Sequence, residues 1–413
     1  MTNDVKKVPE LRFPEFSGEW EEKMLGDVLT ILDGDRGKNY PSGSDFLEYG
    51  HTLFLNASNV TKNGFSFTLK QYITEKKSIS MGNGKLVKND VVLTTRGSIG
   101  NIGWYDEEIY RKTPYARINS GMLILRSNNK DMASFVSQFL MSTKGKRQID
   151  RISFGSAQPQ LTKKDIKLYR IDFPQIKEQQ KIGDFFSKLD RQIELEEQKL
   201  EKLEEQKKGY MQKVFSQELR FKDENGNGYP EWEEKKLGEV ASVYDGTHQT
   251  PKYTNEGIKF LSVENIKTLK SNKYISKEAF DKEFKIRPEY GDVLMTRIGD
   301  VGTTNVVNSY DDLAYYVSLA LLKPKNMNSY FLESLIQSPK IQNELWRKTL
   351  HIAFPKKINK NEIAKVIVNH PKKEEQEKIG NFFRSFDEFL EKQNQKIDRL
   401  KERKQGFSQK MFM

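Results

Sequence analysis

The sequence predicts an α+β protein made of two similar domains and two long helices. Three observations lead to this fold class. The chain repeats itself once after about 200 residues, each copy mixes strand-like and helix-like runs, and each copy ends in an apolar heptad pattern. A period of that length is far too long for a solenoid repeat, so each copy is a domain followed by an appendage. We expect domains over 1–173 and 217–370 and helices over 174–216 and 371–413.

The repeat is visible as paired segments in the same order. The motif ELRF recurs at 10–13 and 218–221, and a tryptophan-led segment recurs at 20–28 and 232–240. The run DVVLTTRGSIG at 90–100 recurs with changes at 292–302, and the start of the first helix at 174–190 recurs at 371–387. A chance origin is not credible. Between these segments the copies diverge, as at 35–52 against 247–257.

Composition limits the class of protein further. The 413 residues carry 69 Lys and Arg against 58 Asp and Glu, a formal charge of +11 that modestly favours a nucleic-acid partner. The absence of cysteine excludes disulfides, thiolate zinc sites and a cysteine nucleophile. The N-terminus has no apolar signal region, and no stretch approaches the roughly 18 apolar residues of a membrane span. We therefore expect a cytoplasmic protein without a membrane partner.

Each domain shows elements of both kinds. Short β-rich runs at 91–94 and 293–296 are broken by Gly and Asn turns, and 132–149 and 329–346 have helical periodicity. An α+β domain accounts for both patterns.

The appendages begin at prolines, which are favoured in the first turn of a helix. Beyond Pro174 and Pro371, apolar residues fall on heptad positions a and d, interrupted by one polar residue in each a row and one Lys in each d row. The predicted seam is Ile182, Phe186, Leu189, Ile193, Leu200, Leu203, Ile379, Phe383, Phe386, Leu390, Ile397 and Leu400. Packing of each helix on its own domain is the alternative, but pairing of the two helices removes both apolar stripes from water.

Linker lengths predict the direction of the pair. The first domain ends where the first helix starts, whereas the second domain begins where that helix ends. The helices are then antiparallel, the domains lie about 50–60 Å apart on a rod, and the tail 409–413 returns to 10–13. The expected molecule is almost circular, with a pseudo-two-fold axis.

Two similar domains around a dyad suit double-stranded DNA, whose half-site spacing mirrors protein symmetry. The rod spans roughly 15 base pairs at about 3.4 Å each, so we expect two short recognised sequences separated by an unread gap. Because the domains have diverged, the two halves differ.

The pattern resembles the specificity subunit of type I restriction–modification systems across essentially the whole chain. The resemblance rests on the segments at 20–28, 90–100 and 174–190 with their second copies, arranged as domain–helix–domain–helix. It implies two target-recognition domains that each read half of a bipartite, asymmetric target. It also implies two modification subunits, restriction subunits in the full complex, and S-adenosylmethionine, ATP and Mg²⁺ bound by those partners, with no cofactor in this chain. Phe386 in place of Leu189, and Asn-His before Pro371, are departures that do not threaten the resemblance.

We predict that the chain is not an enzyme. It lacks a Walker A motif and an N-P-P-[FY] methyltransferase motif, and its four histidines are scattered, so we expect no metal site. Its many acidic pairs are explained by solvated helix faces.

Base reading needs polar or basic side chains on loops or helix starts. Divergent segments in equivalent places supply the candidates Arg36, Lys38, Asn39, Tyr40, Asn59, Arg96, Ser98, Arg151, Gln158 and Gln160 in the first domain, and His248, Gln249, Thr250, Lys252, Asn265, Arg297, Lys348, His351, Lys356 and Lys357 in the second. Lys144, Lys146 and Arg147 are expected to bind phosphates, which position the protein without specifying sequence. Ordinary turns explain any one of the loops equally well. Turn capping is the favoured role for the two asparagines.

Trp20 and Trp232 are either partner contacts or core residues. Two other functions stay open: a stand-alone two-domain DNA-binding regulator or architectural protein, and a coiled-coil adaptor whose basic charge is incidental.

Overall fold

The computed structural model describes residues 8–153, 160–249 and 251–412. The chain divides into two compact units: residues 1–196 with 396–413 form unit 1, and residues 197–395 form unit 2. Both boundaries fall inside the long helices.

Unit 1 contains a four-stranded sheet in the order β2-β10-β7-β8 and a three-stranded sheet in the order β6-β3-β9. Two-stranded sheets β1-β11 and β4-β5 complete it. Its strands are β1 (Glu21–Met24), β2 (Thr30–Asp33), β3 (Thr52–Leu55), β4 (Val60–Thr61), β5 (Gly64–Phe65), β6 (Tyr72–Ile73), β7 (Val91–Thr94), β8 (Ile102–Trp104), β9 (Ala116–Ile118), β10 (Met122–Arg126) and β11 (Arg170–Phe173). The short helices are α1 (Leu25–Val28), α2 (Glu75–Ser80), α3 (Glu107–Lys112), α4 (Lys130–Met141), α5 (Thr143–Ser153) and α6 (Lys163–Lys167), with 3₁₀ turns at Gly43–Asp45 and Ala57–Asn59.

Unit 2 repeats the same plan. Its four-stranded sheet has the order β13-β20-β17-β18, the counterpart of β2-β10-β7-β8, and a second sheet has the order β14-β16-β15-β19. The strands are β12 (Glu233–Lys236), β13 (Ala241–Asp245), β14 (Tyr253–Thr254), β15 (Ile258–Leu261), β16 (Tyr274–Ile275), β17 (Val293–Thr296), β18 (Thr304–Val306), β19 (Leu313–Tyr315), β20 (Leu319–Pro324) and β21 (Ile367–His370). The short helices are α8 (Leu237–Val240), α9 (Lys277–Glu283), α10 (Ser329–Gln337), α11 (Pro339–Arg347) and α12 (Lys360–Ala364), with a 3₁₀ turn at Val263–Asn265.

The mixture of strands and helices confirms the predicted fold class. The repeated run at 90–100 and 292–302 forms the central strands β7 and β17, whose residues are all buried. Continuous apolar runs of four residues suit strands that are covered on both faces.

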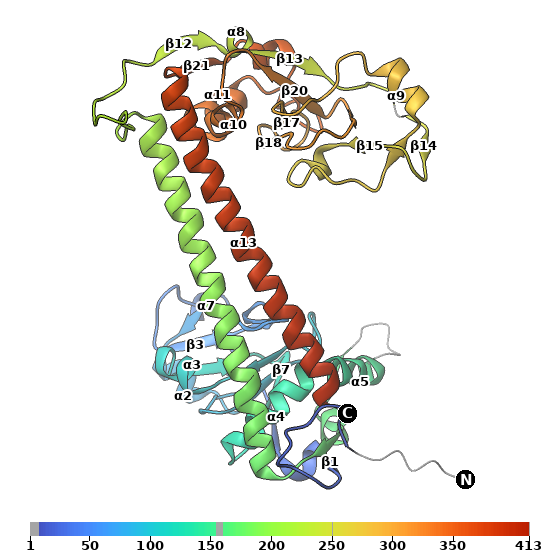
Figure 1. The fold of residues 1–413 in the computed structure, drawn as a ribbon. Coiled ribbons are helices and arrows are strands. Elements are labelled where there is room, and N and C mark those ends of the chain that lie inside the picture. Colours follow the sequence, from blue (N-terminus) through green and yellow to red (C-terminus); the bar gives the residue numbers. More distant parts are fainter. Residues whose placement is uncertain (1–7, 154–159, 250, 413) are drawn as a thin grey trace. The chain divides into compact units, whose positions relative to one another are not determined.

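Figure 1 shows two long helices, α7 (Ile176–Phe215, 40 residues) and α13 (Lys373–Met411, 39 residues). They begin just after Pro174 and Pro371. All twelve predicted seam residues are buried or partly buried. The seam therefore faces protein along both helices, as an apolar stripe requires.

Within each unit, the start of one helix packs on the end of the other. Phe186 stacks on Phe412 in unit 1, with ring centroids 5.4 Å apart, and Phe215 stacks on Phe383 in unit 2 at 5.9 Å. The lysines that interrupt the d rows form ion pairs, Lys404 with Asp190 and Lys207 with Asp387. These pairings run antiparallel in both units.

The repeated ELRF motif anchors the first turn of each long helix. Arg12 donates two hydrogen bonds of 2.7 Å to the buried carboxylate of Glu178. Arg220 binds the buried Glu375 in the same way, at 3.2 and 2.6 Å. A planar guanidinium matches a carboxylate through two parallel bonds, which explains why both residues recur in the repeat.

The two junctions between helix end and following domain are also alike. Leu219 N donates to Lys213 O at 2.9 Å where the chain is continuous, and Leu11 N donates to Lys410 O at 2.8 Å where it is not. The C-terminal end of α13 thus meets the N-terminal segment as the predicted circular organisation requires.

Each unit has its own core, to which a long-helix end contributes. Met411 and Phe412 join the core of unit 1, and Met211 and Val214 join that of unit 2. Trp20 is 2% exposed and packs edge-on against Phe135, so Trp20 is a core residue of unit 1. None of the helices in the described ranges has the length and apolarity needed to span a bilayer.

Candidate nucleic-acid interface

Sheet topology brings the candidate loops to one edge in each unit. In unit 1, β10 pairs antiparallel with both β2 and β7, with Asp33 opposite Leu123 and Thr94 opposite Met122. The ends of β2 and β7 therefore meet at the start of β10. In unit 2, the ends of β13 and β17 meet at the start of β20 in the same way.

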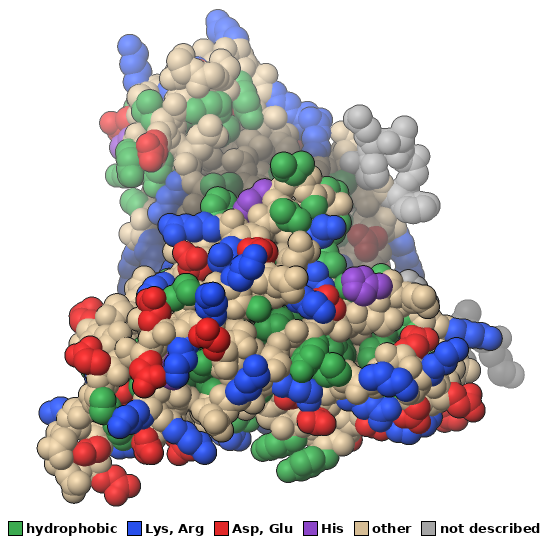
Figure 2. Space-filling model, turned by 90° about the horizontal axis from the view of Figure 1, so that it is seen from above, with side chains coloured by type: hydrophobic (Ala, Val, Ile, Leu, Met, Phe, Trp, Pro, Cys, Tyr) green, Lys and Arg blue, Asp and Glu red, His purple; other side chains and the backbone are tan. Residues whose placement is uncertain are grey.

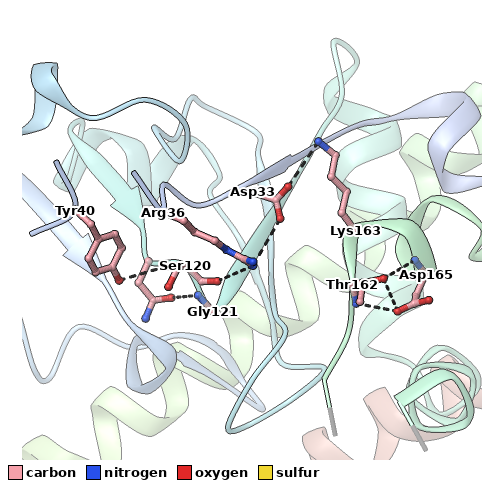
Figure 3. Close-up of polar contacts among 9 residues, drawn as sticks. Asp33, Arg36, Tyr40, Ser120, Gly121, Thr162, Lys163 and Asp165 are labelled. Carbon is pink, nitrogen blue, oxygen red and sulfur yellow. Dashed lines mark hydrogen bonds and ion pairs between the residues drawn. The ribbon is translucent and has the colours of Figure 1, made fainter. Parts of the chain in front are cut away.

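Asp33 organises this edge in unit 1 (Figure 3). Arg36, from the loop after β2, and Lys163, from the first turn of α6, approach its carboxylate from two sides, at 4.0 and 3.7 Å. Arg36 also donates to Ser120 O at 3.3 Å, and the Tyr40 hydroxyl accepts from Ser120 N at 3.4 Å. The loop after β2 is thereby fastened to the turn before β10.

Lys163 is placed by a capping box. Thr162 Oγ1 accepts from Asp165 N at 3.2 Å, while Asp165 Oδ2 accepts from Thr162 N at 2.9 Å. This exchange satisfies two donors at the start of a short helix and fixes its first residue against the sheet edge.

A buried arginine holds the segment after α2, which in turn bonds to the loop after β2. Arg117 is 4% exposed and donates to Ser78 Oγ and to the carbonyls of Met81, Gly82 and Asn83. Gly37 N and Gly82 N in turn donate to the Asp35 carboxylate, and these bonds hold the pKa of Asp35 below its usual range. Burial lowers the pKa of the Arg117 guanidinium, as expected for a cation taken out of water.

Unit 2 places an aspartate at the corresponding strand end. Lys360, the first residue of α12, lies 3.8 Å from Asp245, as Lys163 lies 3.7 Å from Asp33. The second cation differs, because Asp245 pairs with Arg297 from the loop after β17.

The second and third candidate segments of unit 2 are joined. Leu350 N donates to Lys357 O at 2.8 Å, and Gly299 N donates to Lys356 O at 2.7 Å. Ile298 also forms a β-bridge with Lys357. The structure therefore brings the loop after β17 and the hairpin after α11 together at the edge that also holds Asp245.

Three candidates are used inside the fold. For the two asparagines this agrees with turn capping, the role favoured over base reading, whereas for Arg297 it corrects the assignment as a base reader. Asn59 is 1% exposed, and its amide binds Asn56 N, Ser66 O and Leu69 O. Asn265 likewise binds Ser262 N and Lys270 O, so both asparagines close turns.

Arg297 is the third of these candidates. Its side chain is 6% exposed and donates to Ile358 O at 2.9 Å as well as to Asp245. A guanidinium with its donors committed inside the protein does not reach a base edge. Trp232, unlike the buried Trp20, is partly buried, and its indole N–H donates a hydrogen bond to Glu375 at 3.2 Å.

The other candidates lie at or near the surface. Tyr40 and Lys348 are partly buried, and the exposed ones are Arg36, Lys38, Asn39, Arg96, Ser98, Lys146, Arg147, Arg151, Gln160, His248, Gln249, Lys252, His351, Lys356 and Lys357. Gln158 and Thr250 lie outside the described residues. Asn39 donates to Ser80 O at 2.7 Å and so also braces its loop.

Basic residues of α5 line a cavity of about 470 Å³ in unit 1. One stripe of the helix contributes Lys144, Arg147 and Arg151, and the end of α13 contributes Ser408, Gln409 and Phe412. Lys144 lies 3.4 Å from Asp172. Cations on one helix face suit the sequence-independent binding of phosphates.

Sequence reasoning missed Lys163, Lys360 and Arg117 as parts of this edge. The two lysines occupy equivalent positions in the repeat, before Asp165-Ile166 and Glu362-Ile363, and that recurrence was the available signal. Arg117 has no such signal, because Ala314 takes its place on β19.

Charge alone does not mark the interface. Figure 2 shows Lys and Arg side chains interspersed with Asp and Glu over the visible face. In the part of the chain that the structure describes, no three His, Asp or Glu side chains are grouped to hold a metal ion.

Comparisons with known proteins agree with this architecture. The family model described as "Type I restriction modification DNA specificity domain" matches residues 17–205 and 229–402. The chain is 24% identical to the type I restriction enzyme MjaVIII specificity subunit of Methanocaldococcus jannaschii, over 97% of this chain and 93% of that protein. The putative MjaX specificity subunit of the same organism is 22% identical, over 94% and 92%.

Two solved structures share the fold. The type I restriction–modification S subunit from M. genitalium matches with a TM-score of 0.63 at 15% identity, covering 98% of this chain and 99% of that one. A chain from a structure on complex assembly and conformational transition of the type I R-M system matches with a TM-score of 0.56 at 18% identity, covering 96% and 98%. Because the family model matches most of each copy of the repeat, this chain belongs to the family of type I restriction–modification specificity subunits.

Proposed function

We propose that each unit reads one half of a bipartite, asymmetric DNA target, and that α7 and α13 set the gap between the halves. The main support is the repeated sheet edge, where the divergent loops of each unit gather on a common Asp–Lys framework. A conserved framework with variable loops lets one fold read different sequences.

The long helices support the spacer role. At about 1.5 Å per residue, a helix of 40 residues is about 60 Å long. The antiparallel pairings within each unit, Lys404 with Asp190 and Lys207 with Asp387, would fix the register of such a spacer. Equivalent exposed faces on the two copies would offer two equal sites for two modification subunits.

The chemistry of the complex would belong to the partners. On this proposal the chain itself is not catalytic, and modification subunits bind S-adenosylmethionine and methylate adenine. Restriction subunits would use ATP and Mg²⁺ in the complete complex. All of these proteins would act on DNA in the cytoplasm.

Methylome sequencing of cells with and without this chain, both expressing the modification partner, tests the proposal. We expect a split methylated motif that appears only when the chain is present. Unchanged methylation would contradict the proposal and favour a stand-alone DNA-binding regulator.

Domain exchange sharpens the test. Replacing residues 217–370 with those of a homologue should change one half of the motif and leave the other half intact. Inserting one heptad into each long helix should lengthen the gap by about 10 Å, or three base pairs. A change in both halves, or an unchanged gap, would contradict the division of roles.

A further inference from the structure

The hairpin after α11 in unit 2 exposes large apolar side chains at its tip. Ile352 and Phe354 are each 103% exposed, more than any other large hydrophobic residue among those described. Exposed apolar groups of this size normally mark an interaction site, because burying them in a partner is favourable.

The tip is held on a firm base. Leu350 and Lys357 close the hairpin, and Gly299 N fixes Lys356 O from the neighbouring loop. Just below, the buried Ile358 receives a hydrogen bond from Arg297, which is paired with Asp245. The two apolar side chains therefore project from an anchored hairpin.

A second aromatic residue stands beside the tip. Trp346 is 63% exposed, and its ring lies 4.5 Å from the His351 ring, while His351 Nε2 lies 2.9 Å from Trp346 O. This contact braces the first residue of the tip against the end of α11.

The charge around the tip selects the partner. From Leu345 to Asn361 the chain contains no Asp or Glu. Of its cations, Arg347 pairs with Glu344 and Lys360 lies beside Asp245, while Lys348, Lys356 and Lys357 flank the tip in the sequence. A hydrophobic tip flanked by lysines suits a polyanion that also offers apolar faces, and stacked bases between phosphates have that chemistry.

We propose that Phe354, with Ile352 beside it, inserts as a wedge between adjacent base pairs, while the surrounding lysines bind the flanking phosphates. This inference rests on the proposed function, and it adds a reading of base-step deformability to the polar contacts of the loops. Wedges of this kind unstack a step and kink the duplex, so they favour flexible pyrimidine–purine steps.

The test uses the full chain with its modification subunits and duplexes carrying 2-aminopurine at successive steps of the methylated motif. The native complex should raise 2-aminopurine fluorescence at one step in the half read by unit 2. The variant Phe354→Ala should abolish that rise and weaken binding about tenfold, because the duplex loses the side chain inserted between its base pairs. The slope of affinity against salt should stay unchanged, because the lysines remain.

Tyr310→Ala is the matched control. Tyr310 is 89% exposed in unit 2 and stacks on Tyr290 beside Asp311 and Asp312, so its loss should change neither fluorescence nor affinity. Thermal unfolding of both variants should match that of the native chain, because both side chains are exposed.

The outcomes separate the wedge from the proposed function. Salt-dependent, sequence-specific binding that Phe354→Ala leaves intact, with no fluorescence rise in the native complex, would overturn the wedge alone. Loss of modification-subunit capture or of self-association in Phe354→Ala, with DNA binding intact, would overturn it in favour of a protein contact. Absence of specific DNA binding by the native complex would overturn both inferences.

Discussion

The two units keep the same Asp–Lys pair at the sheet edge but use their arginines differently. In unit 1 the arginine beside Asp33 is Arg36, whose side chain is 57% exposed on a loop. In unit 2 it is Arg297, which is 6% exposed and bonded to Asp245 and Ile358. The two copies therefore keep the Asp–Lys pair, whereas the arginine beside it is exposed and available for binding only in unit 1.

The same contrast holds in the sheets beneath. Arg117 holds the end of α2 and the residues after it in unit 1, through Ser78 and three carbonyls, whereas Ala314 occupies the matching position in unit 2. In unit 2, hydrogen bonds join the hairpin at 350–357 to the loop after β17.

The largest expected effect tests what the units share. Removing either guanidinium, by Arg12→Ala or Arg220→Ala, leaves the buried carboxylate of Glu178 or Glu375 without its cation, although Glu375 keeps its hydrogen bond from Trp232. Each variant should lose about 3–5 kcal/mol of unfolding free energy, measured by chemical denaturation.

Hydrogen exchange should localise each loss to its own unit. Arg384→Ala, which breaks the exposed pair with Glu388, is the control and should cost at most about 1 kcal/mol. A large loss in only one of the two buried-pair variants would show that the repeated motif is not energetically equivalent.

The next prediction tests the two arginines. Arg297→Ala removes buried hydrogen bonds to Asp245 and Ile358 and should destabilise unit 2 by about 2–3 kcal/mol. Arg36→Ala should change stability by less than about 0.5 kcal/mol yet weaken DNA binding several-fold. Parallel denaturation and binding titrations measure both; a reversed pattern would contradict the assignment of Arg297 to structure.

Much of the shared framework could be predicted from the sequence, because repetition marks it. The antiparallel helices, their seam and the paired ELRF and helix-start motifs all recur at equivalent positions. Turn capping by Asn59 and Asn265 is the role that the sequence favours for these residues. The role of Arg297 could not be predicted, because the sequence of a divergent loop does not show whether a polar side chain points outward or inward. Its burial is decided by tertiary partners such as Ile358, which lies 61 residues away.

A partly buried carboxyl predicts a difference in pH dependence between the units. In unit 2, burial raises the pKa of Glu333 to about 8; the Asp387 carboxylate acts in the same direction and Lys207 opposes it. Unit 1 has neutral Ser137 and Gln138 on the matching turn of α4, and Gln138 donates to Asp190 at 3.1 Å.

Because the folded state retains a proton that the unfolded state releases, the stability of unit 2 should fall as pH rises from about 4.5 to about 8. Glu333→Gln should remove this fall and raise the unfolding free energy at pH 8 by about 1–2 kcal/mol. Denaturation at pH 5 and pH 8 measures it, with the exposed Glu377→Gln as control. A native chain whose unit 2 is equally stable at both pH values would contradict the shifted pKa.

The smallest effect concerns the lysines that interrupt the apolar seam. Lys404 pairs with Asp190, whereas Lys207 pairs with Asp387 and also interacts electrostatically with Glu333. Partly exposed pairs contribute about 0.2–1 kcal/mol, so double-mutant cycles of Lys404 with Asp190 and of Lys207 with Asp387 should give similar coupling energies near pH 6. Above pH 8, where Glu333 is ionised, Lys207→Ala alone should become more costly than Lys404→Ala by a few tenths of a kcal/mol, because it then leaves two carboxylates uncompensated. Equal costs at both pH values would show that Glu333 does not act on the seam, and would leave the two helix pairings energetically identical.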